Sequence, residues 1–193
     1  MRSQAQTDTF LHDCPAYRLP KNQRPMHQRG FSLIELLIVV SLILIIASIA
    51  IPNLLRARIA ANEAATAASI RTLNTLQVAY SSAYPELGFA PSLVNLGPPP
   101  DGCRSPNANY ACFIDATFAS AGATPRNGYI FLVTVSDSAP HLTYVIGAAA
   151  ATFGKTGVRS FCSTDDGVIR SQLPSSQQIP ATTTDACSAF APL

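Results

Sequence analysis

The pattern of hydrophobic and polar positions divides the chain into a polar start, one long apolar run and a mixed remainder. The apolar run covers residues 31–51, which are 21 residues with Glu35 as their only charge. At about 1.5 Å per residue, a helix of this length measures roughly 31 Å, enough to cross the hydrocarbon core of a bilayer. The run therefore predicts a membrane-spanning helix with one carboxylate near its start.

Beyond this run, a helical period continues as far as Tyr84. Pro52 interrupts the pattern, because an interior proline removes one backbone hydrogen bond and kinks or loosens a helix; it also fits the point of exit from the membrane. Pro85 is expected to end the helix, and the alanine-rich stretch 57–68 favours helix formation. The positions expected on the packed face are Ile59, Thr66, Ile70, Leu73, Leu76, Gln77, Tyr80 and Tyr84.

Residues 85–193 predict a small head built around an antiparallel sheet. Residues 85–128 are rich in turn signals, with a short helical turn expected within 90–97. Four β-rich runs follow, at 129–135, 142–148, 158–162 and 167–170, and the tail 171–193 is expected to be a loop. Consecutive short strands joined by tight turns indicate a meander, so the predicted class is α+β with one sheet face packed on the long helix.

The junction before the apolar run carries a processing motif. Residues 29–35 read RGFSLIE, so a glycine stands before the run and the lone acid stands five residues into it. In an ordinary secretory signal, by contrast, the apolar region precedes the cleavage site and is discarded. The segment from Arg29 to about Leu55 resembles the prepilin signal of type IV pilins and type II secretion pseudopilins. Gly30, Phe31 and Glu35 match the three fixed positions of that signal.

This resemblance implies how the chain is processed and assembled. A prepilin peptidase would cut between Gly30 and Phe31, and the new amino group of Phe31 would be N-methylated. Glu35 would face the Phe31 amine of a neighbouring subunit as the helices pack into a filament. A buried carboxylate and a buried ammonium both lose their hydration, so each is tolerated only opposite the other. The pair would set the register between subunits more than it would add stability.

The 30 residues before Phe31 are expected to be a leader that is removed, together with Cys14. We interpret the first 25 residues as a start-site misassignment, because a start at Met26 gives a compact basic leader; the alternative is a long leader. Five of the 13 basic and two of the 11 acidic residues lie in the leader, so residues 31–193 carry eight basic and nine acidic residues, net −1. This balance gives no sign of a nucleic-acid partner.

Four cysteines follow the apolar run, an even number that is typical of disulfides in an exported head. Short sequence separation favours the pairs Cys103–Cys112 and Cys162–Cys187 among the three pairings that four cysteines allow. A zinc site would need closely spaced Cys-x-x-Cys pairs, which neither spacing supplies. Each bridge is expected to stabilise the head by about 2–4 kcal/mol.

Other chemistry has less support in the sequence. His141 is the one histidine after the leader, and no nucleophile-elbow or phosphate-binding glycine pattern accompanies it. Asp165 and Asp166 could bind calcium, as the C-terminal loop does in the major pseudopilins that this chain resembles, but Asp-Gly is also an ordinary hairpin turn and few other acids lie nearby. Arg56 and Arg58 are expected at the membrane interface. We predict no enzyme activity, no cofactor and no metal site.

The sequence thus predicts a filament subunit with a leader (1–30), a membrane-spanning and filament-core helix (31–52), an amphipathic helical half (53–84) and a head (85–193). It is expected in the bacterial inner membrane, with a cytoplasmic N-terminus and a periplasmic head, and then in a filament of identical or related subunits. Expected partners are the prepilin peptidase/methyltransferase, an inner-membrane assembly platform and membrane lipid. A type IV pilin and a type II secretion pseudopilin both remain open. The alternative outside this class is a membrane-anchored exported binding domain that does not polymerise.

Overall fold

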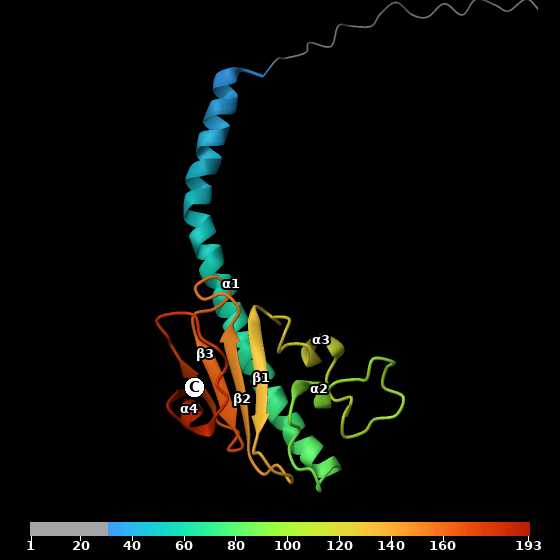
Figure 1. The fold of residues 1–193 in the computed structure, drawn as a ribbon. Coiled ribbons are helices and arrows are strands. Elements are labelled where there is room, and N and C mark those ends of the chain that lie inside the picture. The colour runs from blue at the N-terminus through green and yellow to red at the C-terminus, as the bar shows by residue number, and fades with distance from the viewer. Residues whose placement is uncertain (1–30) are drawn as a thin grey trace, which may run out of the picture. The chain divides into compact units, whose positions relative to one another are not determined.

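The structure, a computed structural model, describes residues 31–193, and the predicted leader lies outside this range. By compactness the chain divides into two units, one ending at Ile43 and one spanning Leu44–Leu193. The elements in order are α1 (Leu33–Ala83), α2 (Leu93–Leu96), α3 (Ala116–Ala119), β1 (Tyr129–Val135), β2 (Tyr144–Ala150), β3 (Ser160–Thr164), β4 (Ile169–Gln172), α4 (Thr184–Ser188) and β5 (Ala191–Pro192) (Figure 1). The predicted α+β class, a long helix with an antiparallel sheet, is confirmed.

The helix α1 includes residues of both units. Pro52 lies inside α1, which continues on both sides of it, because one proline removes a single bond of the helical ladder. In the second unit the predicted stripe faces the sheet, whereas Ile59, Leu76 and Tyr84 are only half-buried. The buried residues of α1 are Thr66, Ala67, Ile70, Leu73, Gln77 and Tyr80.

The sheet is a meander of five antiparallel strands in the order β1-β2-β3-β4-β5. β1 has the predicted bounds, and β2, β3 and β4 each begin two residues later than predicted. The prediction of four strands and a loop-like tail is wrong, because the tail contributes α4 and the edge strand β5. This last strand pairs Ala191 with Ser171 and Pro192 with Arg170.

The later starts of β3 and β4 have a common physical cause. Glu63 on α1 accepts hydrogen bonds through Oε1 from the backbone N–H groups of Val158 (3.0 Å) and Arg159 (3.2 Å). Asp166 Oδ1 likewise accepts from the N–H of Val168 at 2.9 Å. A backbone N–H that is already used by a side chain does not donate to a neighbouring strand, so β3 and β4 begin only after these residues.

Both faces of the sheet are covered. The face toward α1 forms the main core, which includes Tyr129, Phe131 and Ile146. On the other face, Val145, Cys162 and Cys187 form a smaller cluster under the tail, with Ala181 and Phe190 packed against it. All seven residues of β2 are therefore buried. Gly147 permits this close approach, since a Cβ at that position would lie 2.2 Å from the carbonyl oxygen of Ala181.

Candidate functional site

The processing motif lies at the start of α1. The carbonyl oxygen of Ser32 accepts from the N–H groups of Glu35 (3.1 Å) and Leu36 (3.2 Å), which places Glu35 in the first helical turn. An acid is favourable there, because the unpaired N–H groups of the first turn give the helix end a partial positive charge. Phe31 precedes the helix and is 77% exposed. Gly30, on the other side of the predicted cleavage point, lies outside the described residues.

The apolar side chains that follow this motif have no packing partners within the described chain. Those from Leu33 to Ile46 keep between 47% and 81% of their surface exposed. Burying one such side chain away from water is favourable by about 1.5–3 kcal/mol. Leaving all of them exposed to water would therefore cost on the order of 20 kcal/mol of hydrophobic free energy. Among the described residues, α1 is the one helix long and apolar enough to span a membrane. Its surface requires lipid or other helices around it.

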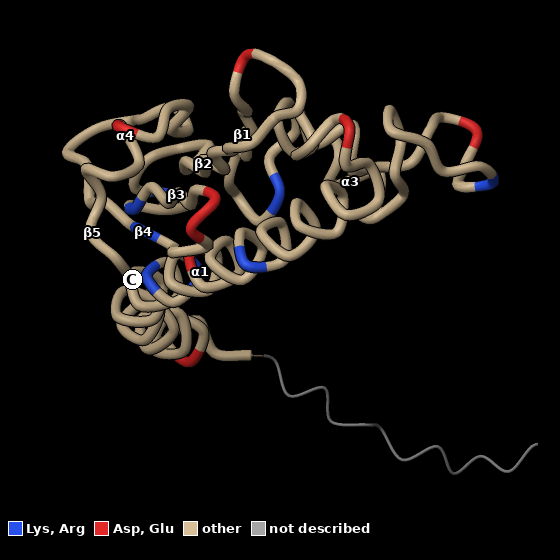
Figure 2. Tube along the Cα trace, turned by 90° about the horizontal axis from the view of Figure 1, so that it is seen from below, with Lys and Arg blue, Asp and Glu red and all other residues tan. Residues whose placement is uncertain are grey.

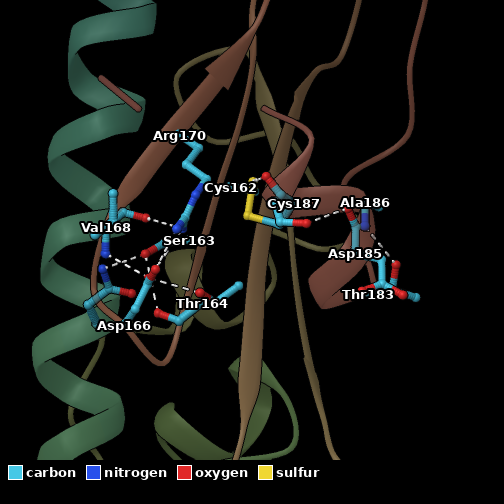
Figure 3. The surroundings of a disulfide bond; sticks show 12 residues. Cys162, Ser163, Thr164, Asp166, Val168, Arg170, Thr183, Asp185, Ala186 and Cys187 are labelled. Carbon is cyan, nitrogen blue, oxygen red and sulfur yellow. Dashed lines mark hydrogen bonds and ion pairs between the residues drawn. A yellow bond between two sulfur atoms is a disulfide. The ribbon is translucent and has the colours of Figure 1, made fainter. Parts of the chain in front are cut away.

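Two disulfides stabilise the head, with the pairing that short sequence separation favours: Cys103–Cys112 and Cys162–Cys187, separated by 9 and 25 positions. The second bridge is buried and joins β3 to α4, as Figure 3 shows. Thr183 caps α4 by accepting a hydrogen bond from the N–H of Ala186 at 3.2 Å. The bridge thereby fixes the tail on the outer face of the sheet.

Of the two candidate calcium residues, Asp166 stabilises the β3–β4 turn through hydrogen bonds (Figure 3). Asp166 Oδ1 accepts from Thr164 Oγ1 at 2.8 Å and from the N–H of Val168 at 2.9 Å, and Arg170 forms an ion pair with the same carboxylate. The hydrogen bond from Arg170 holds the pKa of Asp166 well below its usual range. Asp165 is exposed beside it. Within residues 31–193, no group of three or more His, Cys, Asp or Glu residues is placed to hold a metal ion.

His141 joins two loops of the head. Its ring Nδ1 lies 2.6 Å from the carbonyl oxygen of Ser136. Its backbone N–H donates to Leu87 O at 2.8 Å, and its carbonyl oxygen accepts from the N–H of Phe89 at 2.9 Å. Gly88 sits between these two bonds with φ +78°, and a Cβ there would be 2.2 Å from His141 O. The histidine therefore fastens the loop after α1 to the loop between β1 and β2.

Three polar side chains of α1 hold the head together, and the sequence analysis gave them no such role. Glu63 binds the chain before β3, and Asn74 Nδ2 donates to Ser163 Oγ at 2.9 Å. Gln77, expected only as a position on the packed face, binds both backbone groups of Ala90. A glutamine inside an apolar helical stripe was the available signal, because a buried amide needs hydrogen-bonding partners.

Charged residues are sparse along the described chain, as the short coloured segments of Figure 2 show. Within residues 31–193, three ion pairs join Arg126 with Asp115, Arg159 with Glu63 and Arg170 with Asp166.

Comparison with known proteins agrees with this description. Residues 25–51 match the family model described as the prokaryotic N-terminal methylation motif. The chain is 39% identical over 74 residues to the type IV major pilin protein PilA of Myxococcus xanthus, an alignment that covers 35% of this chain and 34% of that one. The chain thus spans about a third of the relative that it matches, and no solved structure matches it. The chain thus carries the N-terminal methylation motif at the start of a long apolar helix that leads into an α+β head, and over about a third of its length it is similar to a type IV major pilin.

Proposed function

We propose that the chain is a subunit of a type IV pilus-like filament, cut between Gly30 and Phe31 and N-methylated on Phe31. The observation that carries the proposal is Glu35 in the first turn of a helix whose apolar side chains are exposed. A carboxylate in hydrocarbon costs roughly 2.5–3.5 kcal/mol without a partner. The amine that cleavage creates on Phe31 of a neighbouring subunit supplies one, at the same end of the helix.

Before assembly, the subunit resides in the inner membrane with its head in the periplasm. Lys21, Arg24 and Arg29 precede the apolar run, and basic residues favour the cytoplasmic side of a membrane span. Two disulfides in the head fit an oxidising compartment on the other side. In this scheme residues 1–30 are the leader, 31–52 span the membrane and later form the filament core, and 53–84 connect to the head at 85–193. Assembly then requires a platform in the inner membrane and an ATPase that is a separate protein.

Within the family, we propose a pilus as the first candidate. The similarity to a protein named as a type IV major pilin supports this choice. So does the lack of a clear calcium loop of the kind found in major pseudopilins, since the candidate acid Asp166 is bound by Arg170. A type II secretion pseudopilus is the second candidate, favoured by the resemblance of the hairpin at 154–170 to the last hairpin of pseudopilin-like proteins. In either filament the role is structural rather than catalytic.

The first test is the intact mass and N-terminal sequence of the protein, made with and without a prepilin peptidase. We expect a mature chain that begins at N-methyl-Phe31. The mass of the precursor also shows whether translation begins at Met1 or Met26. A chain that stays uncut, or that is cut beyond the apolar run, contradicts the proposal and favours a tethered or secreted domain.

The second test addresses Glu35 in the bacterium that makes the protein. Glu35→Gln removes the charge but keeps the size, and we expect loss of surface filaments with normal cleavage and membrane levels. Glu86→Gln is the matched control, because Glu86 is an exposed acid of the head. Electron microscopy counts pili, and the activity of secreted enzymes in the medium reports type II secretion. If Glu35→Gln changes neither readout, the chain is a membrane-anchored binding domain that does not polymerise.

A further inference from the structure

Three segments that are distant in the sequence enclose a pocket of about 580 Å³ within the unit Leu44–Leu193. One segment is the α1 stretch 55–62, the second is the turn that precedes β1, and the third is the loop that follows β2. The lining residues are Leu55, Arg58, Asn62, Asn127, Gly128, Lys155 and Thr156. The notable feature of this lining is that it combines two cations, two side-chain amides and one leucine.

Hydrogen bonds and one close glycine contact hold the walls of the pocket in place. Asn62 Nδ2 donates to the carbonyl oxygen of Thr156 at 2.9 Å, which fixes the loop after β2 on α1. The N–H of Thr156 donates to Thr152 O at 3.0 Å, so this loop is itself a closed turn. Gly128 has φ +74°, and a Cβ there would lie 2.7 Å from Cβ of Thr156. The pocket is therefore built into the fold, and its shape does not depend on the positions of flexible side chains alone.

The two cations of the pocket have no acidic partner among the described residues. The three ion pairs of residues 31–193 engage Arg126, Arg159 and Arg170, whereas Arg58 and Lys155 are exposed. Glu63 is the adjacent acid on α1, but its carboxylate accepts from the N–H groups of Val158 and Arg159. A guanidinium, an ammonium and amide N–H groups are the donors that phosphate oxygens prefer. The pocket thus favours a phosphate-type anion.

The position of the pocket along α1 indicates that this phosphate belongs to a lipid headgroup. The side chains directly before it, Ile51 and Leu54, are 66% and 72% exposed, and Leu55 itself forms part of the wall. Arg56 is the first charge after this apolar stretch. A cationic pocket at the end of an apolar helical surface matches the boundary between lipid tails and headgroups, where basic side chains reach for phosphates.

We propose that this pocket binds the phosphodiester headgroup of an anionic membrane lipid, with the acyl chains lying along the apolar surface at Ile51 and Leu54. Arg58 and Lys155 bind the phosphate oxygens, and Asn127 adds amide donors. Because α1 and the loop after β2 would both contact one lipid, the bound lipid holds the head of a stored subunit at the membrane surface. The inference rests on the membrane-anchored part of the proposed function and on nothing in filament assembly.

The test measures lipid binding to the full chain purified in a nonionic detergent. Native mass spectrometry counts bound phosphatidylglycerol and, separately, zwitterionic phosphatidylcholine over a range of concentrations. We expect one phosphatidylglycerol to bind in preference to phosphatidylcholine. Each of Arg58→Gln and Lys155→Gln should weaken this binding about fivefold, the effect expected of one basic group at a lipid surface. Arg56→Gln, which removes the same charge from the same helix outside the pocket lining, should change it by less than about twofold.

Three results would overturn the proposal. The first is equal binding of the two lipids by the wild type, and the second is an equal loss in Arg56→Gln, which would indicate diffuse charge. The third is displacement of the lipid by millimolar inorganic phosphate, which would mark a site for a soluble anion. Thermal unfolding of each variant separates lost binding from lost folding. The assay uses neither peptidase nor filament, so its failure is distinct from the failure of cleavage at Gly30 or of assembly through Glu35.

Discussion

Gln77 offers a direct test of how the head is held on α1. Its side chain is 0% exposed, and so is Ala90 in the loop after the helix. Gln77 Nε2 donates to Ala90 O at 3.1 Å, and Gln77 Oε1 accepts from Ala90 N at 2.8 Å. One side-chain amide therefore satisfies both backbone groups of a residue that water does not reach. Replacing Gln77 by alanine removes both bonds at once.

The expected effect of Gln77→Ala follows from these two contacts. Each buried backbone group left without a partner costs about 1–3 kcal/mol. The empty volume of the missing side chain adds to this loss, and the better helix propensity of alanine returns only about 0.3 kcal/mol. We therefore expect the free energy of unfolding to fall by about 3–5 kcal/mol, a large share of the 5–15 kcal/mol typical of a domain.

Urea unfolding of the full chain in detergent measures this change. The chain has six tyrosines and no tryptophan, so tyrosine fluorescence reports on the head, which contains all the tyrosines after the leader except Tyr80 of α1 and Tyr84, which directly follows α1. Gln178→Ala is the matched control, because Gln178 is exposed, and it should change stability by less than about 0.5 kcal/mol. A loss below about 1 kcal/mol in Gln77→Ala, with the Ala90 amide still protected from hydrogen exchange, would refute the reasoning.

Two further predictions concern the tail and the β3–β4 turn. Gly147→Ala should destabilise the head by about 1–3 kcal/mol, because the new Cβ would lie 2.2 Å from Ala181 O. Gly122→Ala is the control, because a Cβ there would lie at an ordinary contact distance, 3.4 Å from Phe131 O. Equal melting temperatures for the two variants would contradict this prediction. Asp166→Asn should lower stability most at neutral pH. The depressed pKa of Asp166 means that its contribution is present above the unfolded-state pKa of about 3.9 and is lost as pH falls through the folded-state value. Urea unfolding from pH 7 to pH 2 should therefore narrow the difference in stability between this variant and the wild type, and a difference that is constant with pH would disprove the assignment.

Local patterns predicted α1, β1 and the motif at Glu35, because each depends on residues that are neighbours along the chain. The start of β2 did not follow its local pattern. Leu142 has the composition of a strand residue, yet it is 71% exposed, and its N–H donates to Ser136 Oγ at 3.2 Å instead of to a neighbouring strand. His141 fastens that same loop to the chain after α1, a contact that composition does not encode.

The tail was the largest error of the sequence-based prediction. Its Ser, Thr and Pro content favours a loop, but β5 forms because β4 offers an unpaired edge, and α4 forms over a disulfide that ties it to β3. The role of Glu63 in binding the chain before β3 was equally hidden, since its partners lie 95 and 96 positions away. In the candidate site, the residues of the motif were visible in the sequence, whereas the pocket at Arg58 and Lys155 depends on three segments that only the fold brings together.

The contacts between α1 and the later chain also bear on when the subunit becomes native during its synthesis. Asn62 with Thr156, Glu63 with Val158 and Asn74 with Ser163 are pairs separated by 94, 95 and 89 positions. Contacts of such long range form late, because the intervening chain must first be ordered. The ribosome completes α1 well before any of these partners emerges. The apolar face of α1 that includes Ile70 and Leu73 is therefore exposed to water for much of translation. A nascent chain of this protein therefore needs a chaperone or the membrane surface to shield its helix until β3 has left the ribosome.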